Sequence, residues 1–327
     1  MRHGSTREST ADIVVIGSLV MDRKFFPAGT FALGSAAGTL HGVERHHGGV
    51  GRNVAVNLAR LGARSTFVGL SGFGADAAEL EDVLAATGVE VRVRRTTDGV
   101  GRFDVLLDGR GNQVCARPVL PDPAQGKPLC TPDLAARVER ADAVVVEGGL
   151  DEGLLEWTAR QARGRAVPVC GMPTRQGDLG PRPRLLPLYD ILILNTAEAR
   201  AVLDGTVPAG AESARRACPA AAVLAACLHR LGPRVVVVTG GPDGAAVAWP
   251  RCPDAVHLPT EPVPCADDTG AGDALASAFL FGLTSGEGPR AALARGLSAA
   301  ALTVGCRRTT CRALGRFPRD PPGRLTD

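Results

Sequence analysis

Short apolar runs alternate along most of the chain with longer segments in which apolar residues recur at helical spacing. The apolar runs have the length of strands and cover 12–20, 64–70, 141–149, 165–171, 190–195 and 234–241. The segments with helical spacing cover 51–62, 75–88, 151–163, 196–204 and 212–231. Because strands that alternate with helices usually pair in parallel, this pattern predicts an α/β protein whose sheet is covered by helices on both faces.

Two segments interrupt this alternation. Residues 24–47 are rich in Gly and Ala and have the character of a loop, whereas residues 89–120 alternate polar and apolar positions around Asp-Gly and Gly-Asn turns. The second pattern is typical of antiparallel strands. We expect the two segments to form a small β-structured flap beside the main sheet, and the chain after Arg312 to be irregular.

Composition narrows the class of protein. Of the 327 residues, 45% are hydrophobic and 22% charged, as expected for a globular protein with a large core. The net charge is +3, and its cationic side chains are almost all arginine, since Lys24 and Lys127 are the only lysines. No basic stretch carries interleaved aromatic residues, so we expect no nucleic-acid partner. No apolar run approaches the length of about 18 residues that spans a membrane, so we expect no membrane partner.

The cysteines and the first residues of the chain indicate the cellular compartment in which the protein is expected. The nine cysteines are scattered without Cys-x-x-Cys spacing, and we therefore expect neither a disulfide framework nor a zinc site. The polar opening "MRHGSTRESTAD" lacks the apolar segment of a signal peptide. These features predict a reduced, cytoplasmic protein.

The segment "DDTGAGDALASAFLFGL" (267–283) joins a tight Gly-Ala-Gly turn to a strongly apolar helix. Backbone N–H groups at such a turn point ahead of the helix and bind anions. Asp273 in the first turn could simply offset the helix dipole, but such a cap requires neither the two glycines nor so apolar a helix. We favour a site in which the amides of Gly270, Ala271 and Gly272 hold a transferring phosphate while Asp273 accepts a proton from the attacking hydroxyl.

A second glycine-rich turn, "HHGGVGRN" (46–53), also leads into a helix. Gly48 and Gly49 would let the backbone approach a polyol closely, and Asn53 could bond its hydroxyls, although a plain helix start explains the turn equally well. We expect His46 and His47 to be solvated. Asp22 follows the first strand at its carboxyl end, where open α/β sheets bind ligands, but spacing alone favours a solvated loop residue there.

Two further motifs could serve a nucleotide. "ILNTAEA" (193–199) places Asn195 at a strand end and Glu198 in the next turn, a plausible pair for Mg²⁺ held through water. "VTGGPDGAAV" (238–247) is a strand, a glycine-rich turn and another strand. That turn could cover a nucleotide, and a plain turn is as good an explanation.

Taken together, these motifs resemble the ribokinase-like (phosphofructokinase-B-type) sugar kinases over nearly the whole chain. "GGVGRN" near residue 50 and "DTGAGDA" near residue 270 match the two signatures of that family in order and spacing. The resemblance implies one three-layer α/β/α kinase domain over 1–327, with a β-sheet lid formed by about 24–47 and 89–120. It also implies ATP and Mg²⁺ as cofactors, a small-molecule sugar or nucleoside as acceptor, and a homodimer formed through the lid.

The resemblance assigns roles residue by residue. It implies that Asp273 is the general base, that Gly270, Ala271 and Gly272 form the anion hole, and that Asp22, Gly48, Gly49 and Asn53 contact the sugar. Asn195 and Glu198 fall on the metal–phosphate motif, and Thr239, Gly241 and Gly244 fall on the nucleotide loop. Asp267 and Thr269 match positions that help hold a monovalent cation such as K⁺.

Within that family the chain is most similar to pseudouridine kinases, through "GGVGRNVAVNLARLG", the frame "GSLVMD" and "LSAAALTV". It departs from them at Val20, where they usually have Asn, and at 170–179, where Thr174 and Arg175 replace an Asp-Pro-Val-Ser run followed by Lys. Asp268 also replaces a small residue or Thr. The resemblance therefore implies 5′-phosphorylation of a ribosyl compound, first of all pseudouridine, with another nucleoside or a free sugar as the alternative.

Two different classes of protein remain as alternatives. Gly72-x-Gly74-x-x-Ala77 with Glu90 downstream imitates the dinucleotide fingerprint of an oxidoreductase, although a lone match of this kind is weak. A non-enzymatic nucleoside-binding regulator on the same fold would be expected to lack the base or the anion-hole glycines, which are present. A classical P-loop is excluded, because neither lysine lies in a Gly-Lys-Ser/Thr context.

Overall fold

The computed structural model describes residues 10–27, 40–107, 113–173, 183–204, 220–264, 267–306 and 308–318. Its larger sheet is formed by β1 (Asp12–Ser18), β4 (Arg64–Ser71), β5 (Glu90–Arg95), β8 (Ala143–Glu147), β9 (Val169–Met172), β10 (Ile191–Asn195), β11 (Val235–Thr239), β12 (Ala245–Trp249) and β13 (Cys252–Leu258). The strand order is β13-β12-β11-β10-β9-β8-β1-β4-β5, and the strands from β11 to β5 pair in parallel. The pairs β11–β12 and β12–β13 are antiparallel, so β12 alone runs against the other strands of this sheet, and the expected α/β fold with a mostly parallel sheet is confirmed.

Helices cover both faces of this sheet, as the alternation of strands and helices predicts. The helices are α1 (Val50–Leu61), α2 (Ala75–Ala85), α3 (Pro132–Val138), α4 (Glu152–Arg163), α5 (Thr196–Asp204), α6 (Ala220–His229), α7 (Ala271–Thr284) and α8 (Pro289–Val304). Successive residues of β1 point to opposite faces. Ile13 and Val15 pack with α1, α2, α7 and α8, whereas Val14 and Ile16 pack with α3, α4, α5 and α6.

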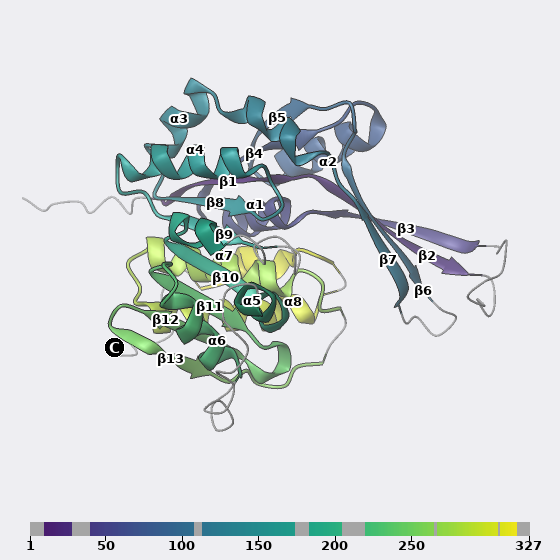
Figure 1. Cartoon of the computed structure of the whole chain (residues 1–327). Coiled ribbons are helices and arrows are strands. Elements are labelled where there is room, and N and C mark those ends of the chain that lie inside the picture. Colours follow the sequence, from purple (N-terminus) through teal and green to yellow (C-terminus); the bar gives the residue numbers. More distant parts are fainter. Residues whose placement is uncertain are drawn as a thin grey trace, which may run out of the picture.

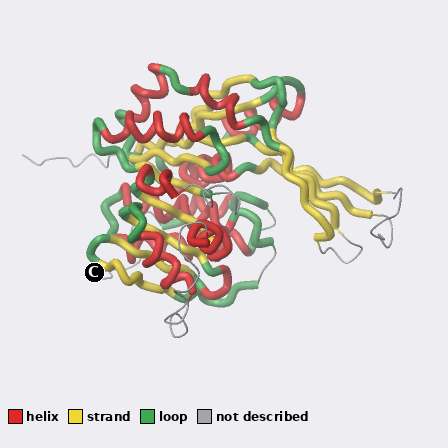
Figure 2. Tube along the Cα trace, in the orientation of Figure 1, coloured by secondary structure: helices red, strands yellow, loops and turns green. Residues whose placement is uncertain are grey.

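A smaller four-stranded sheet projects from this body, and we call it the lid (Figures 1 and 2). It consists of β2 (Val20–Pro27), β3 (Leu40–Gly48), β6 (Gly101–Leu107) and β7 (Gln113–Val119) in the order β3-β2-β6-β7. The expectation of a loop over 24–47 is therefore wrong for 24–27 and 40–47, which are strands. The expectation of a loop rested on the high glycine and alanine content of this segment. Pairing with neighbouring strands outweighs the weak β-propensity of such single residues.

Strand β5 corrects a second expectation, because it belongs to the main sheet and not to the lid. It pairs in parallel with β4, from Thr66 opposite Glu90 to Ser71 opposite Arg95. At this edge Val91 and Val93 pack on the core while the residues between them face outward, which produces the alternation seen in the sequence. Alternation indicates a half-buried strand but not the sheet to which that strand belongs.

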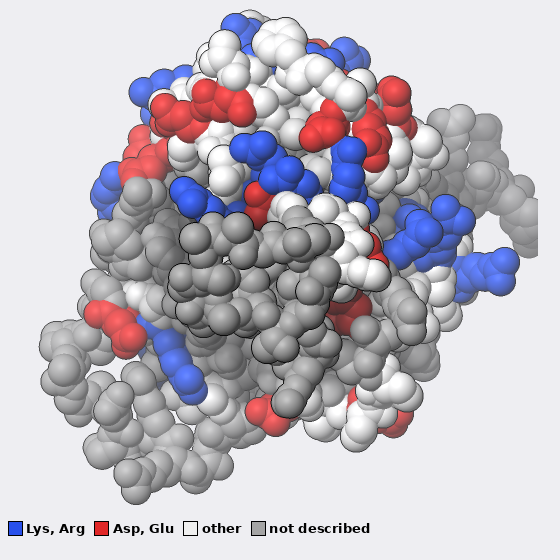
Figure 3. Space-filling model, turned by 90° about the vertical axis from the view of Figure 1, so that its right-hand side faces the viewer, with Lys and Arg blue, Asp and Glu red and all other residues white. Residues whose placement is uncertain are grey.

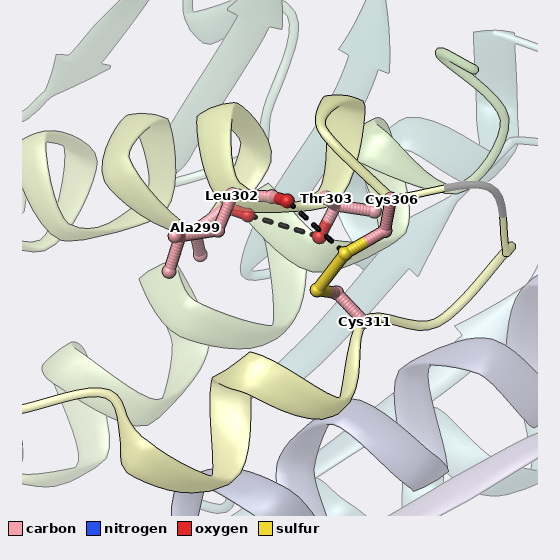
Figure 4. The surroundings of a disulfide bond; sticks show 5 residues. All are labelled: Ala299, Leu302, Thr303, Cys306 and Cys311. Atoms are coloured by element: carbon pink, nitrogen blue, oxygen red, sulfur yellow. Dashed lines mark hydrogen bonds between the residues drawn. A yellow bond between two sulfur atoms is a disulfide. The ribbon is translucent and has the colours of Figure 1, made fainter. Parts of the chain in front are cut away.

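The cysteines give a third correction. Cys306, just beyond α8, forms a disulfide with Cys311 across a short loop (Figure 4). The sequence offers no Cys-x-x-Cys spacing here, and the pairing arises because the chain turns back after α8 towards the short 3₁₀ helix η5 (Arg312–Arg316). That helix also shows that part of the expected irregular tail is ordered.

Candidate active site

The first turns of α1 and α7 bring together two of the predicted site residues that lie far apart in the chain. The side-chain amide of Asn53, in α1, donates a hydrogen bond of 2.8 Å to Oδ2 of Asp273, in α7. Both side chains are buried. The contact fixes the orientation of the Asp273 carboxylate and engages only one of its two oxygens, Oδ2.

Burial sets the protonation behaviour of two carboxylates here. Burial raises the pKa of Asp273 to about 6, although the hydrogen bond from Asn53 favours the ionised form and opposes this. Asp22 lies within strand β2 of the lid and not in a loop, and burial raises its pKa to about 7. Lys24 and Arg52 lower the pKa of Asp22, while the negative charge of Asp273 raises it further.

The predicted glycines allow close approach of the backbone. A Cβ at Gly48 would overlap the Asp22 carboxylate, and a Cβ at Gly49 would overlap the carbonyl oxygen of Ser18. Gly49 also has a φ of 102°, which side chains rarely tolerate. The turn before α1 therefore requires glycine at both positions, because its backbone passes close to the Asp22 carboxylate and to Ser18 O.

The turn before α7 has the geometry expected of an anion-binding loop. Gly270 caps the helix with a φ of 84°, and a Cβ there would overlap the carbonyl oxygen of Thr309. The Ala271 N–H donates to Asp268 O at 3.1 Å within the turn. The N–H groups of Gly272 and Asp273 lack an acceptor four residues back within α7, so they are the amides that the turn directs ahead of the helix.

Asp267 links this turn to the lid. Its Oδ1 accepts a hydrogen bond of 2.9 Å from the Thr269 N–H, and its Oδ2 accepts from Nζ of Lys24, on β2, at 3.2 Å. Burial acts to raise the pKa of Asp267, but the Thr269 hydrogen bonds and Lys24 together hold it below its usual range. A lysine ammonium thus contacts the carboxylate that the resemblance assigns to a monovalent cation.

Asn195 and Glu198 form a reciprocal capping box at the start of α5. The Asn195 N–H donates to Oε2 of Glu198, and the Glu198 N–H donates to Oδ1 of Asn195, each at 2.9 Å. Among the described residues no group of three His, Cys, Asp or Glu could hold a metal by itself. The pair still fits Mg²⁺, which retains several waters and binds through one or two carboxylates together with substrate phosphates.

The predicted nucleotide loop lies beside this pair. Thr239, at the end of β11, is directly opposite Asn195 in the parallel register of β10 and β11. Gly241–Asp243 forms a short 3₁₀ turn (η4), closed by a hydrogen bond of 2.7 Å from the Gly240 N–H to Gly244 O. Gly244 has a φ of 91°, and a Cβ there would overlap Leu258 O, so its glycine is required by the turn itself.

Three side chains near the site escaped the sequence reasoning. Glu147, buried at the end of β8, accepts hydrogen bonds from the Ser18 and Gly51 N–H groups at 2.8 and 3.0 Å. Arg52 is 4% exposed and donates to His47 O and to Oδ1 of Asn53. Phe103, on β6, is directly opposite Asp22 in register and 37% exposed. The position of Glu147 at the end of an apolar strand could have identified it from the sequence. Phe103 could be identified only from the pairing of β2 with β6 in the lid.

Glu147 also lines a cavity of about 240 Å³ between the body and the base of the lid. Ser18 and Leu70 line it from the ends of β1 and β4, Leu120 and Asp122 from the segment after β7, and Gly148 from the turn after Glu147. The described residues that line this cavity include two carboxylates and no Lys or Arg. It is therefore suited to a neutral ligand rich in hydrogen-bond donors and not to an anionic one.

The remaining sequence features have structural explanations. His47 bonds Glu79 at 2.7 Å and His46 bonds Glu44 at 3.3 Å, both at partly exposed positions. A Cβ at Gly72 would overlap the backbone of Gly99, so this glycine of the imitated dinucleotide fingerprint serves packing. Thr174 and Arg175 lie outside the described residues.

Acidic and basic side chains lie in small groups among uncharged ones on the face seen in Figure 3. No helix in the described ranges is both long and apolar enough to cross a membrane.

Comparison with known proteins agrees with this geometry. The chain is 28% identical to ribokinase from Mus musculus over 84% of its own length and 82% of that protein. It is 27% identical to guanosine-inosine kinase from Exiguobacterium acetylicum over 89% of its length and 94% of that protein. The structure of Arabidopsis thaliana ribokinase complexed with ribose and ATP superposes with a TM-score of 0.74 at 22% identity, covering 94% of this chain and 98% of that one.

The family description "pfkB family carbohydrate kinase" matches residues 10–313, which include the lid, the Asn53–Asp273 contact and the α7 turn. This match excludes the oxidoreductase alternative, because it accounts for the whole sheet and for the segment that a dinucleotide fold leaves unexplained. The chain belongs to the pfkB family of carbohydrate kinases and is a phosphotransferase that acts on a hydroxyl group.

Proposed function

We propose that this protein transfers the γ-phosphate of ATP to the 5′-hydroxyl of a ribosyl compound, first of all pseudouridine. The observation that carries the proposal is the buried Asn53–Asp273 contact, which aims an oriented carboxylate beside the anion-binding turn of α7. The resemblance to ribokinase and to guanosine-inosine kinase supports a ribose-bearing acceptor.

In the proposed mechanism, Asp22 and Asn53 hold the acceptor hydroxyls, and Gly48 and Gly49 admit the sugar ring closely. Asp273 accepts the proton of the attacking hydroxyl, for which a pKa of about 6 suits a base working near neutral pH. The turn Gly270, Ala271 and Gly272 balances the charge on the transferring phosphate through the N–H groups of Gly272 and Asp273 that it directs ahead of α7, and positioning contributes much of the rate.

The nucleotide is proposed to lie along the neighbouring strand ends. Asn195, Thr239, Gly241 and Gly244 would hold it, and Glu198 would hold Mg²⁺ through water. Mg²⁺ held there would neutralise the charge on the phosphates. Asp267 and Thr269 would serve the monovalent-cation site if Lys24 releases Asp267 when the nucleotide binds.

Phe103 favours a nucleoside over a free sugar. Residues opposite each other in register project from the same face of a sheet, so its ring lies on the lid face that carries Asp22. An aromatic ring beside a sugar-binding carboxylate can stack on a base. The cavity lined by the carboxylates of Glu147 and Asp122 suits a base edge rich in N–H groups, and pseudouridine offers one more ring N–H than uridine.

A second candidate function is the phosphorylation of a free sugar such as ribose, and the similarity to ribokinase supports it. The test is kcat/KM for pseudouridine, uridine, guanosine and ribose under one set of conditions with Mg²⁺ and ATP. We expect pseudouridine to lead. A roughly tenfold lead for ribose would exclude the nucleoside proposal and leave the sugar-kinase assignment.

The variant Phe103→Ala distinguishes a nucleoside kinase from a kinase of free sugars more directly. Loss of a stacking ring is expected to raise KM about tenfold for nucleosides and to leave the KM for ribose unchanged. Phe73→Ala is the matched control, because it removes the same ring at a position that is 71% exposed and lies outside the lid. An equal effect of Phe103→Ala on ribose would contradict stacking.

We further propose that the lid mediates a homodimer. Val43 and Val119 are 47% and 39% exposed, and both lie on the face of the lid opposite to the one that carries Asp22. Exposed apolar side chains on a projecting sheet favour association with a second copy.

A further inference from the structure

A basic hollow, separate from the proposed catalytic residues, lies where the base of the lid meets α1, α2 and the loop after α8. Its volume is about 720 Å³, the size of a small-molecule site. The described residues that line it include no Asp or Glu. Five arginines and two histidines are among them: Arg45, His46, His47, Arg52, Arg60, Arg308 and Arg312. Neither Asp273 nor the residues at the ends of β10 and β11 line it.

Nearby acidic side chains neutralise only part of this charge. Arg45 pairs with Asp76 and Glu79, and the two histidines contact Glu79 and Glu44. Within the described ranges, Arg60, Arg308 and Arg312 have no acidic partner, and Arg52 donates only to His47 O and to Asn53. The hollow therefore holds an excess of positive charge.

Two of these arginines have buried donors that nothing satisfies. Nε of Arg52 and Nη1 of Arg60 are buried without a hydrogen-bond partner in the described structure, and Arg52 is 96% buried as a residue, since only 4% of it is exposed. Burial, together with the neighbouring arginines, lowers the pKa of both guanidinium groups, although Asp22 opposes this shift for Arg52. Unpaired charged donors in a concave site are costly unless a ligand supplies the acceptors.

We propose that this hollow is a second anion-binding site, which takes a small molecule with two or more negative charges, such as a phosphate-bearing or polycarboxylate metabolite. Guanidinium groups suit such a ligand because their forked donors bind phosphate and carboxylate oxygens in pairs. Arg60, Arg308 and Arg312 provide the uncompensated charge, and Arg52 closes the inner wall. The site is distinct from the anion hole of α7, although Thr309 touches both.

The test is a calorimetric titration of the full chain at about 50 mM salt, where screening is weak. A non-hydrolysable ATP analogue with Mg²⁺ first saturates the catalytic site, so that the probe cannot bind the α7 turn. The probes are pyrophosphate and citrate, which distinguish phosphate from carboxylate recognition. We expect one of them to bind with a 1:1 ratio and to raise the Tm of the protein.

Three variants locate the binding. Arg60→Gln and Arg312→Gln should each weaken the bound probe about tenfold or more, because each removes a charge-assisted contact. Arg64→Gln is the matched control, since Arg64 lies just beyond α1 with its side chain 70% exposed and paired with Asp12, away from the hollow. Arg312 is exposed, so its replacement tests the site even if Arg60→Gln fails to fold.

Two outcomes would overturn the proposal. One is an absence of binding for both probes at millimolar concentration in the wild-type protein. The other is binding that Arg60→Gln and Arg312→Gln leave as strong as in Arg64→Gln, because the anion would then lie elsewhere.

Discussion

Asp273 is the residue on which the proposed chemistry depends most. Replacing it with Asn keeps the shape of the side chain and a contact with Asn53 but removes the proton acceptor. We expect kcat to fall by about 10²–10⁴, the usual contribution of a general base, while KM changes little. Steady-state kinetics and the Tm of the variant measure this, and near-normal turnover would show that another group takes the proton.

The same residue predicts a pH dependence. Asp273 must be ionised to act, so kcat should fall as the pH drops through about 6, its raised pKa. The free energy of unfolding depends on pH in the opposite direction to that expected for a salt-bridged carboxylate. The folded pKa lies above the unfolded value of 3.8, so the stabilising contribution is complete below about pH 4 and is lost as pH rises through about 6.

Asp273→Asn removes this titration and therefore checks the assignment. Relative to wild type, the variant should gain stability between pH 4 and pH 7, by an amount on the order of 1.4 kcal/mol per unit of pKa shift. Chemical denaturation at the two pH values measures the difference. A constant difference would mean that Asp273 has an ordinary pKa in the folded protein.

At the scale of elements, the junction between the lid and α1 depends on Gly49. Gly49→Ala places a Cβ against Ser18 O at a φ of 102°, so the start of α1 must shift. We expect a loss of about 1–3 kcal/mol in the free energy of unfolding and weaker acceptor binding. Gly315→Ala, in η5, is the control, because a Cβ there meets no atom within 4 Å. Equal stability of the two variants would contradict the strained turn.

The lid itself is expected to close over the acceptor. Its strands β2 and β6 carry Asp22 and Phe103, and Lys24 is the one described lid side chain that forms an ion pair with the α7 turn. Ligand binding should therefore slow amide exchange in β2, β3, β6 and β7 but leave α4, on the far face of the main sheet, unchanged. Exchange that is the same with and without pseudouridine and an ATP analogue would argue against closure.

At the scale of the whole molecule, the proposed homodimer through the lid can be tested by substitution. A Val43→Asp, Val119→Asp double variant places charge on the exposed face of the lid and should convert a dimer to a monomer in light scattering. Leu302→Asp, on α8 with Leu302 41% exposed, is the control, because it changes an equally exposed apolar residue outside the lid. A wild-type monomer at micromolar concentration would exclude the dimer.

Local sequence patterns determined the alternation of strands and helices and the glycine turns before α1 and α7, whereas only the resemblance to a family of kinases assigned Asp273 and Asn53 to one site. These features depend on residues close together in the chain: apolar periodicity, helix starts and backbone conformations that only glycine adopts readily. For the same reason the boundaries of α4, α5 and β10 agree with the expected segments to within about two residues.

Tertiary structure decided what depends on distant segments. Alternation could not assign β5 to the main sheet, and composition could not reveal strands in 24–27 and 40–47, because pairing partners lie elsewhere in the chain. The register that places Phe103 beside Asp22, the raised pKa of Asp273 and the Cys306–Cys311 bond also follow from packing. The arginines of the basic hollow are scattered over more than 250 positions, from Arg45 to Arg312, and only folding concentrates their charge in one place.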